Sequence, residues 1–332
     1  MIKLTNKSGA YVTLSPFGAG ITSIVVPDRE GNLQNIALAY ADPQDYLNDG
    51  PCLGKIPGRY ANRIGHGKLS VDGKDYQLAV NCGPHHLHGG PTGFQNRVWD
   101  TEEFPGGVRF TYRSADGEEN YPGNVTVVAE YRWSDDNVLS LEMTATTDAP
   151  TVINLTNHLY VNLDGADSGN ALGQLLTLKA SRWLVTDPDL CPTGELAPVE
   201  GTPMDFTEEK QVGRDIKADF PALIYGKGYD NCYAVDGWEP GTLVEDVAVL
   251  RSERSGRVMA ISSTQPALQL YTGNWLAGSP LNHSGRSYED YDGVAIELQG
   301  MPDAPNHPEF PSQLLLPGTP YRQSIRFAFT TR

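Results

Sequence analysis

Apolar and polar residues alternate with a period of two along this chain, which is the pattern of β-strands with one face turned to a core. Residues 125–133 alternate in this way, turn through 134–137 and return as 138–147, which predicts a β-hairpin. Two further hairpins are predicted, pairing residues 68–71 with 75–78 and 244–252 with 258–264. The last strand places five residues on one face: Tyr321, Gln323, Ile325, Phe327 and Phe329.

Helical patterns are scarce. No window of ten or more residues holds a clean helical period, so we expect short helical turns only at residues 43–48 and 207–216. Many antiparallel strands, with turns about every ten residues and no alternation with helices, predict an all-β fold, a large antiparallel sandwich or barrel. No internal repeat, low-complexity tract or Ser/Gly-rich linker interrupts the sequence. We therefore expect a single domain over residues 1–332.

The overall charge limits the partners. A formal net charge of -16 argues against nucleic acid and against an anionic membrane surface, because both need a basic face. A small neutral or cationic ligand fits better. No apolar run approaches the roughly 18 residues of a membrane span, and the first residues lack the apolar segment of a secretory signal, so we expect a cytoplasmic protein. Its four cysteines are far apart in the sequence and are expected to be reduced thiols.

A carboxylate stands in the middle of an apolar strand at residues 293–299. Val294, Ile296 and Leu298 point to one side of the strand, and Glu297 and Gln299 to the other. An ionisable group in such a run costs free energy unless it is paired, hydrogen-bonded or turned toward a wet cleft, and such groups collect at functional sites. The alternative is an edge strand whose polar face is simply solvated.

The segment 153–163 shows the same alternation over a longer stretch. One side is apolar apart from Asn157, and the other carries a polar row: Asn154, Thr156, His158, Tyr160 and Asn162. Gln265, Gln269 and Tyr271 repeat the pattern. A sheet face lined in this way suits a polyhydroxylated ligand, because each sugar hydroxyl needs both a donor and an acceptor. A solvent-facing sheet surface is the alternative.

Three loops add candidate chemistry. His85, His86 and His88 lie in a loop rich in Gly and Pro, where His86 and His88 have the spacing of some metal sites, although hydrogen bonding to an oxygen is the favoured interpretation. Arg59, Asn62 and Arg63 lie between two glycines, where an arginine can also simply offset nearby acids. Asp230 follows a Gly-Lys-Gly turn, which is also a common position for a capping residue.

Taken together, five motifs in order resemble the aldose 1-epimerases, also called galactose mutarotases, over nearly the full chain. The motifs are GRYANRI at 58–64, LHGG at 87–90, NLTNH at 154–158, ALQLYTGN around Gln269, and AIELQ followed by PDAPNHPEFPS. The resemblance implies a β-supersandwich, no cofactor and no metal, and interconversion of the α and β anomers of free hexoses such as galactose or glucose. It does not indicate the oligomeric state.

Carried over by position, the resemblance implies that Glu297 is the catalytic base and His158 the acid. It also implies sugar contacts at six positions: Asn62, Arg63, His88, Tyr160, Asp230 and Gln269. The chain departs from the usual family pattern at Leu159, Val161 and Asn231, which bears on sugar preference. Three other classes stay open: a sugar-binding module without catalysis, a phosphosugar epimerase with arginines around a phosphate, and a metal-dependent isomerase using His86 and His88.

Overall fold

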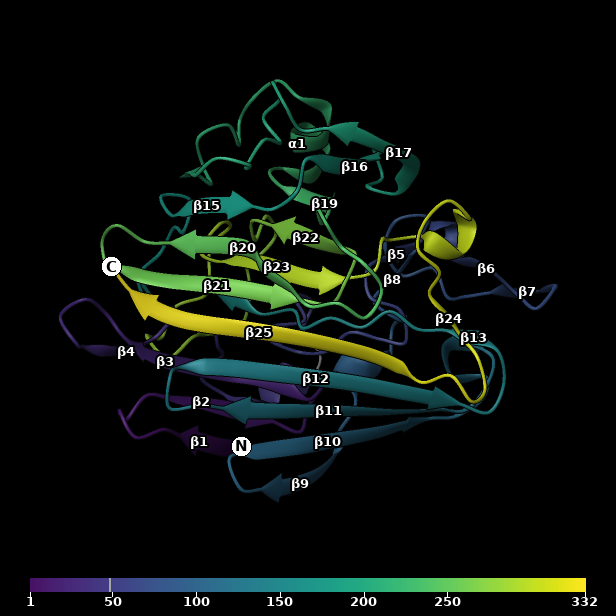
Figure 1. The fold of residues 1–332 in the computed structure, drawn as a ribbon, viewed down its shortest axis with the longest axis horizontal. Helices are drawn as coiled ribbons and strands as arrows, with labels where there is room; N and C mark the ends of the chain where they lie inside the picture. The colour runs from purple at the N-terminus through teal and green to yellow at the C-terminus, as the bar shows by residue number, and fades with distance from the viewer. Residues whose placement is uncertain (48) are drawn as a thin grey trace.

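The computed structural model describes residues 1–47 and 49–332 and consists almost entirely of antiparallel β-structure (Figure 1). In the described residues the largest sheet has nine strands, in the order β18-β15-β20-β21-β25-β12-β11-β10-β9. Their bounds are β9 (Asp100–Phe104), β10 (Gly107–Ser114), β11 (Val125–Trp133), β12 (Val138–Thr147), β15 (Leu175–Leu178), β18 (Lys210–Gln211), β20 (Val244–Arg251), β21 (Arg257–Ser263) and β25 (Tyr321–Thr331).

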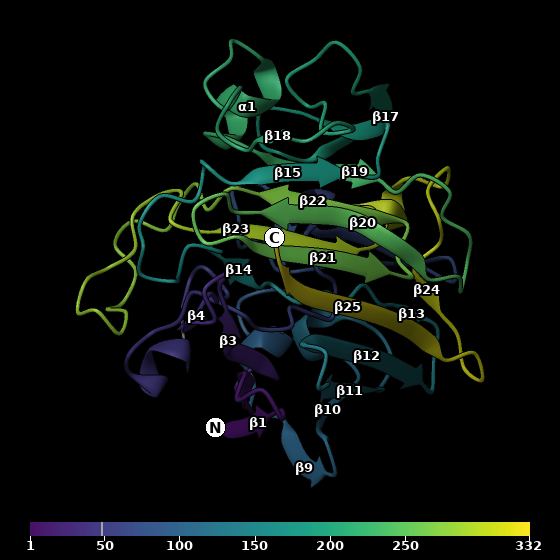
Figure 2. The same ribbon diagram turned by 60° about the vertical axis from the view of Figure 1, so that its left-hand side comes forward.

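A second sheet carries most of the residues of interest. Within the described ranges it has six strands in the order β14-β23-β22-β19-β16-β17. Their bounds are β14 (Tyr160–Val161), β16 (Arg182–Thr186), β17 (Pro192–Pro198), β19 (Asp230–Ala234), β22 (Ala267–Tyr271) and β23 (Val294–Gln299). Figure 2 shows strands of this sheet beside β20 and β21 of the first. One buried apolar cluster contains residues of both sheets, so the expected large antiparallel sandwich is confirmed.

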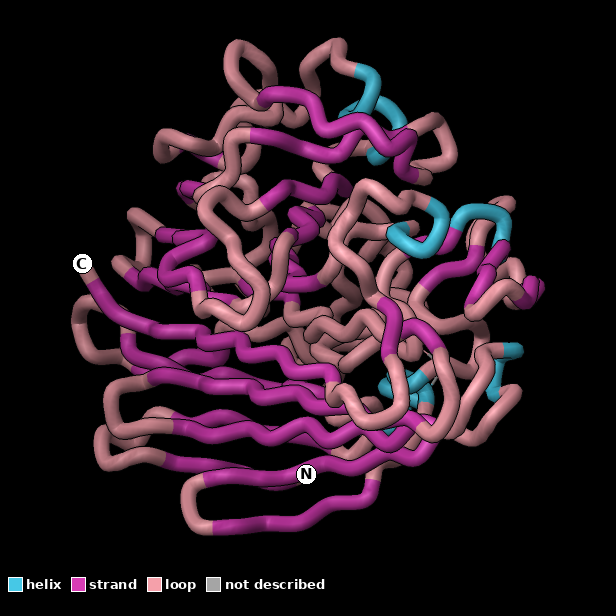
Figure 3. Tube along the Cα trace, turned by 45° about the vertical axis from the view of Figure 1, so that its right-hand side comes forward, coloured by secondary structure: helices cyan, strands magenta, loops and turns pink. Residues whose placement is uncertain are grey.

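Smaller elements complete the fold. A four-stranded sheet contributes to the same core and comprises β1 (Ile2–Thr5), β2 (Tyr11–Ser15), β3 (Gly20–Pro27) and β4 (Leu33–Asn35). Three two-stranded ladders are β5 (Arg63–Ile64) with β8 (His86–Leu87), β6 (Lys68–Val71) with β7 (Lys74–Gln77), and β13 (Thr151–Val152) with β24 (Leu314–Leu315). The helical segments, cyan in Figure 3, are α1 (Pro221–Gly226), η1 (Pro43–Leu47), η2 (Gly65–Gly67), η3 (Phe94–Asn96), η4 (Glu118–Asn120) and η5 (Ala304–Asn306). No helix in the described part of the chain has the length and apolar character needed to cross a membrane.

The three predicted hairpins and the last strand are confirmed. β11 pairs with β12, β6 with β7 and β20 with β21, each within one or two residues of the expected bounds. Along β25 the predicted inner face is buried or partly buried, while Arg322 and Arg326 on the other face are exposed. Period-two alternation was informative here because one side of each strand meets the core.

The helical predictions are only partly correct. A 3-10 turn forms at Pro43–Leu47, and Asn48 lies outside the described residues. The helical turn predicted at 207–216 is wrong, because that segment forms turns and the short strand β18. Val212 and Ile216 are both buried and four residues apart, which imitates a helical face. The one α-helix among the described residues, α1, is too short to show a period, although Pro221 at its start and the left-handed Lys227 at its end are typical helix boundaries.

The two faces of the six-stranded sheet carry different side chains, apolar on one face and polar on the other. Leu268, Leu270, Ile296 and Leu298 face the main core and are fully or almost fully buried. The other face of β23 carries Glu297, which is 2% exposed. β23 lies between β14 and β22, so the alternative of a solvated edge strand is wrong, and the carboxylate is held on an inner strand.

Candidate active site

A cavity of about 510 Å³ opens on the polar face of the six-stranded sheet. Its wall combines residues from β5, β14, β19, β22 and β23 with the loops beside them. The lining includes seven of the eight predicted site residues: Asn62, Arg63, His88, His158, Tyr160, Asp230 and Glu297. Residues far apart in the sequence therefore meet in one pocket whose volume is typical of a small-molecule site.

Glu297 and His158 approach one another at the bottom of this cavity. The Nε2 atom of His158 lies 3.5 Å from Oε1 of Glu297, and both side chains are more than nine-tenths buried. The second carboxylate oxygen, Oε2, has no hydrogen-bond partner among the described residues. A carboxyl and an imidazole therefore meet in the cavity, and one carboxyl oxygen is left to accept a hydrogen bond from a ligand.

The His158 ring is fixed from two sides. Its backbone N–H donates to the carbonyl of Lys55 at 2.8 Å, and its carbonyl accepts from the N–H of Gly54 at 2.9 Å. The ring stacks on Tyr160, with centroids 4.8 Å apart and an interplanar angle of 24°. Tyr160 is itself held by a hydrogen bond from its hydroxyl to the Pro51 carbonyl at 3.1 Å. The orientation of the imidazole is thus set before any ligand enters.

Burial shifts the acid–base pair toward its uncharged forms. Desolvation raises the pKa of Glu297 well above its usual value, the Asp230 carboxylate raises it further, and the Arg63 guanidinium opposes both. Desolvation also lowers the pKa of His158 to about 4, and the nearby Lys55 ammonium contributes to the lowering. Titratable groups perturbed in this way inside a cleft are characteristic of active sites.

His88 lies beside His158 in the cavity wall, with the rings edge to face and their centroids 5.3 Å apart. Its Nδ1 atom accepts a hydrogen bond from the backbone N–H of Asn62 at 3.1 Å. In the neutral ring the proton therefore resides on Nε2, which becomes a donor. Burial lowers the pKa of His88 well below its usual value, so the neutral form prevails. This ring can donate to an oxygen of a ligand, as expected for a sugar contact.

A metal site built on His86 and His88 does not fit the structure. His86 is fully buried away from the cavity, with Nδ1 2.6 Å from the Ala79 carbonyl and Nε2 2.6 Å from the Tyr121 hydroxyl. His88, His158 and Glu297 do lie close enough to surround an ion. However, a ligating His88 would need a free electron pair on Nε2, whereas the hydrogen bond from Asn62 places the proton there.

Asn62, Arg63 and Asp230 line another part of the cavity wall, and Gln269 supports it. Nη2 of Arg63 lies 3.5 Å from Oδ2 of Asp230, and Nε2 of Gln269 donates to Oδ1 of Asp230 at 2.6 Å. Asn62 accepts the backbone N–H of Arg63 through its own side-chain oxygen at 2.8 Å. Gln269 is not among the residues that line the cavity and reaches it through Asp230. The wall offers a cation, a carboxylate and one amide to the hydroxyls of a ligand.

The polar row at 154–162 does not act as one surface, so that part of the prediction is wrong. His158 and Tyr160 line the cavity, whereas Asn154, Thr156 and Asn162 do not. Asn154 joins two backbones instead, donating to the Ala61 carbonyl at 3.1 Å and accepting from the N–H of Gly300 at 2.8 Å. Only residues 160 and 161 of this stretch form a strand, so the segment runs past the cavity rather than along it.

The three departures from the family pattern lie away from the cavity. Leu159 and Val161 belong to the main hydrophobic core. Asn231 is fully buried, does not line the cavity, and accepts a hydrogen bond from the N–H of Asp230 at 3.2 Å. None of the three side chains is placed to contact a ligand directly.

Two aromatic residues of the wall were not predicted as site residues. Tyr271 stands at the end of β22, and Trp275, which is 47% exposed, lies at the mouth of the cavity. Their rings are nearly parallel, at 17° and 6.4 Å, and the Tyr271 hydroxyl accepts the N–H of Trp275 at 3.2 Å. The alternation of Gln265, Gln269 and Tyr271 already marked Tyr271, whereas nothing in the sequence distinguished Trp275 from a core residue.

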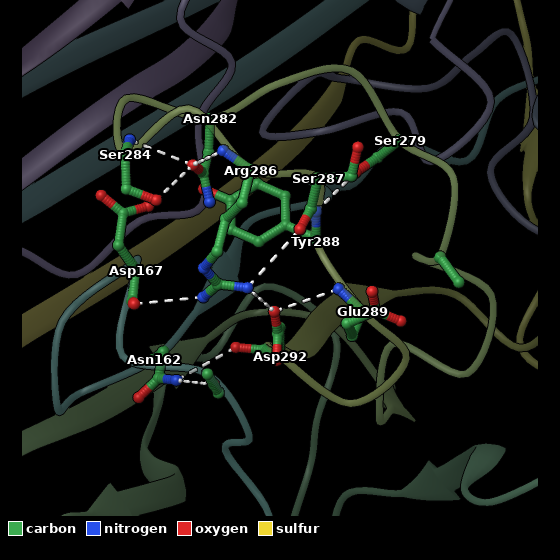
Figure 4. Close-up of polar contacts among 12 residues, drawn as sticks. Asn162, Asp167, Ser279, Asn282, Ser284, Arg286, Ser287, Tyr288, Glu289 and Asp292 are labelled. Atoms are coloured by element: carbon green, nitrogen blue, oxygen red, sulfur yellow. Dashed lines mark hydrogen bonds and ion pairs between the residues drawn. The ribbon is translucent and has the colours of Figure 1, made fainter.

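The loop that leads from Trp275 back to β23 is tied down by an ion pair. Figure 4 shows Arg286 between Asp167 and Asp292, with Nη1 2.9 Å from Oδ2 of Asp292 and Nη2 donating to the Asp167 carbonyl at 3.1 Å. The Asp292 carbonyl also accepts from Asn162 at 3.1 Å. These contacts fix the entry into the strand that carries Glu297.

Comparison with known proteins identifies the family of this chain. The family model for aldose 1-epimerase matches residues 1–328. Human galactose mutarotase is 38% identical over 319 residues, covering 96% of this chain and 91% of that protein, and the aldose 1-epimerase of Escherichia coli (strain K12) is 35% identical over 332 residues, covering 99% and 94%. The crystal structure of an aldose epimerase homologue from C. elegans superimposes with a TM-score of 0.90 at 32% identity, covering 99% and 98% of the two chains.

The chain belongs to the aldose 1-epimerase family, as its five motifs indicated. The expected class of enzyme, an isomerase that epimerises sugars, is confirmed by the same matches.

Proposed function

We propose that this protein interconverts the anomers of free hexoses such as galactose or glucose, with Glu297 as the base and His158 as the acid. The 3.5 Å approach of the two buried side chains inside the cavity is the observation that carries this assignment. Family membership supports the reaction, and the curated relatives named galactose mutarotase support galactose as a substrate.

The reaction needs two proton transfers at the anomeric centre. Because burial favours the uncharged pair, the proton of the Glu297 carboxyl first passes to Nε2 of His158, 3.5 Å away, which gives the carboxylate and the imidazolium that the reaction uses. Glu297 then accepts the proton of the C1 hydroxyl while His158 donates a proton to the ring oxygen, so the bond between C1 and the ring oxygen breaks and an aldehyde forms. Rotation about the bond between C1 and C2 presents the other face of the carbonyl. On closure the C1 oxygen recovers a proton from Glu297 and His158 recovers its own, so the enzyme is unchanged.

The remaining polar groups hold the ring in reach of this pair. Arg63 and Asp230 are proposed to bind hydroxyls distant from C1, with Gln269 acting on the same group of contacts. His88 donates to the ring oxygen or a neighbouring hydroxyl, and Asn62 and Tyr160 complete the set. Holding the reactant in one orientation is itself worth several orders of magnitude in rate.

A phosphorylated sugar fits the cavity less well. Among the described lining residues Arg63 is the one cation, whereas Asp189, Asp230 and Glu297 are acids. Arg59 binds the Pro122 carbonyl at 2.7 Å elsewhere, and Arg97 pairs with Glu118 at 2.8 Å. Neither of these arginines lines the cavity, so the phosphate-binding cluster that such a substrate requires is missing from the described wall.

Polarimetry of freshly dissolved α-galactose and α-glucose tests the proposed reaction directly. We expect the protein to speed the approach to the anomeric equilibrium well above the rate in buffer. Binding of galactose in calorimetry without any acceleration would instead identify a sugar-binding module on this fold. Extending the assay to xylose and arabinose then ranks the substrates.

We also propose that the chain forms one domain in the cytoplasm. The family model extends from residue 1 to residue 328, and the last strand, β25, is an inner strand of the largest sheet. All four cysteines are free, which is compatible with a reducing compartment.

A further inference from the structure

The chain that follows β23 returns to the back of the Arg63 segment. Asp303 stands in this return, is 4% exposed, and adopts a left-handed backbone conformation with a φ of 57°. Such a conformation is costly for a residue other than glycine, so the surrounding contacts must hold it in place. Asp303 does not line the cavity, and the catalytic mechanism does not use it.

Asp303 is hydrogen-bonded to β5 and to the residue that follows it. Its backbone N–H donates to the carbonyl of Arg63 at 2.9 Å, and its Oδ1 accepts the backbone N–H of Gly65 at 2.8 Å. The same oxygen accepts from the side chain of Asn306 at 2.6 Å, which orients the carboxylate. A Cβ added at Gly65 would lie 2.9 Å from Oδ2 of Asp303, so the two segments are in close contact.

Arg63 depends on this support because its own side chain is loosely held. Among the described residues its guanidinium has one ionic partner, Asp230, at 3.5 Å, and its Nε atom has no hydrogen-bond partner. On its other side β5 pairs only with the two-residue strand β8, through Leu87 and His86. The position of the guanidinium is therefore set mainly by the backbone that Asp303 fixes.

Other contacts keep the same return loop attached when the carboxylate is absent. The Tyr60 hydroxyl accepts the N–H of Ala304 at 3.1 Å and donates to the Met301 carbonyl at 3.3 Å. Asn154 joins Ala61 to Gly300 nearby. The loop thus has several attachments, whereas the bond to Gly65 is made by Asp303 alone.

We propose that Asp303 is a positioning residue, which sets β5 against β23 so that Arg63 and Glu297 hold the same pyranose ring. This inference rests on the proposed role of Arg63 as a sugar contact. The carboxylate of Asp303 acts through the backbone of Arg63 and Gly65 and touches no reacting atom.

Steady-state mutarotation of galactose by Asp303→Ala and Asp303→Asn tests the proposal. We expect Asp303→Ala to raise KM about tenfold with kcat nearly unchanged, because binding of ground state and transition state is weakened alike. Asp303→Asn keeps an acceptor for the N–H of Gly65 and should recover most of the loss. Glu309→Gln is the matched control, because Glu309 lies on the same segment and pairs with His307, as Oδ2 of Asp303 also does at 3.5 Å, but among the described residues has no hydrogen bond to β5 or Gly65; its KM should not change.

A double variant separates positioning from a general loss of stability. In an Arg63→Ala background, adding Asp303→Ala should change KM by less than about twofold, because both changes weaken the same contact between Arg63 and the sugar. A further tenfold rise in that background, or an equal loss in the Asn variant, would overturn the proposal.

If Asp303→Ala does not fold, Asp303→Glu, which places the carboxylate one methylene too far, takes its place with the same expectations. Absence of mutarotation in the unmodified protein would refute the proposed function instead, and calorimetric affinities of the same variants for galactose would then decide the role of Asp303.

Discussion

Gln269 donates a 2.6 Å hydrogen bond to the carboxylate of Asp230 from the neighbouring strand, and it does so from behind the wall of the cavity. The two strands are paired with Asp230 opposite Tyr271 and Cys232 opposite Gln269, so the side chains share one face of the sheet. The amide therefore orients a carboxylate that faces the ligand. We therefore expect Gln269 to act on a sugar by supporting Asp230.

Replacing Gln269 by Leu should raise KM for galactose about tenfold while kcat changes little, because Asp230 loses a hydrogen bond to its charge. Gln265→Leu is the control. Gln265 is a buried amide just before the same strand, and its side chain lines a different cavity. Initial rates over a range of galactose concentrations give both constants. An unchanged KM in Gln269→Leu would show that Asp230 needs no such support.

Glu297→Gln should lower kcat by roughly 10² to 10⁴. The amide has nearly the same shape as the carboxyl but cannot take the proton of the C1 hydroxyl, so the pocket remains while the base is lost. Polarimetry measures the rate, and calorimetry with galactose checks that the pocket still binds. A variant that retains near-normal activity would contradict the role of Glu297.

His158→Asn should cause a loss of similar size, about 10² to 10⁴ in kcat, because no acid then protonates the ring oxygen. The stack on Tyr160 is lost as well, so circular dichroism should accompany the assay to verify the fold. His283→Asn, which removes an exposed histidine outside the cavity, should behave like the unmodified protein. Equal activities of the two histidine variants would refute the assignment.

The buried imidazole should make the free energy of unfolding depend on pH. The folded-state pKa of His158 is about 4, below the value of 6.5 expected when the chain is unfolded, so the unfolded state binds the proton more readily. Stability is then fully present above about pH 6.5 and declines as the pH falls toward 4, by on the order of 3 kcal/mol in total from this group. Urea unfolding between pH 4 and pH 8 should show a decline that is shallower in His158→Asn. Parallel curves for the two proteins would contradict it.

The pKa shift of Glu297 changes the free energy of unfolding with pH in the opposite direction. Its pKa is raised in the folded protein, so the folded state holds the proton more tightly and stability is lost as the pH rises above the usual range of a glutamate. We therefore expect Glu297→Gln to be more stable than the unmodified protein at pH 7, with a smaller difference near pH 4. Urea unfolding at these two pH values measures both differences, and a less stable Gln variant at pH 7 would count against burial as the cause.

Sequence patterns were most informative where a single strand decides the geometry. The hairpin of β11 and β12 and the inner face of β25 follow from alternation alone, because each strand has one face in the core. The position of Glu297 on the polar face of β23 followed for the same reason, although only the structure shows that both edges of the strand are paired.

The remaining features depend on contacts between distant segments, which local patterns do not encode. Trp275 belongs to the cavity because its loop folds back against Tyr271, and Asn154 leaves it because it joins Ala61 to Gly300. The segment 207–216 has helical spacing, yet Lys210 turns inward to donate to the Pro203 carbonyl at 2.7 Å. In each case a tertiary contact overrides the local preference.

The strand that carries Glu297 pairs with β22 from Ala295 to Gln299 and with β14 at Val294 and Ala295, and His158 is held through its backbone and its ring. The backbone behind both side chains is therefore held in place, so we expect the sugar rather than the backbone to move in each turnover. The open-chain aldehyde then rotates while Glu297 and His158 stay in place. No closing movement of the protein has to precede the chemistry.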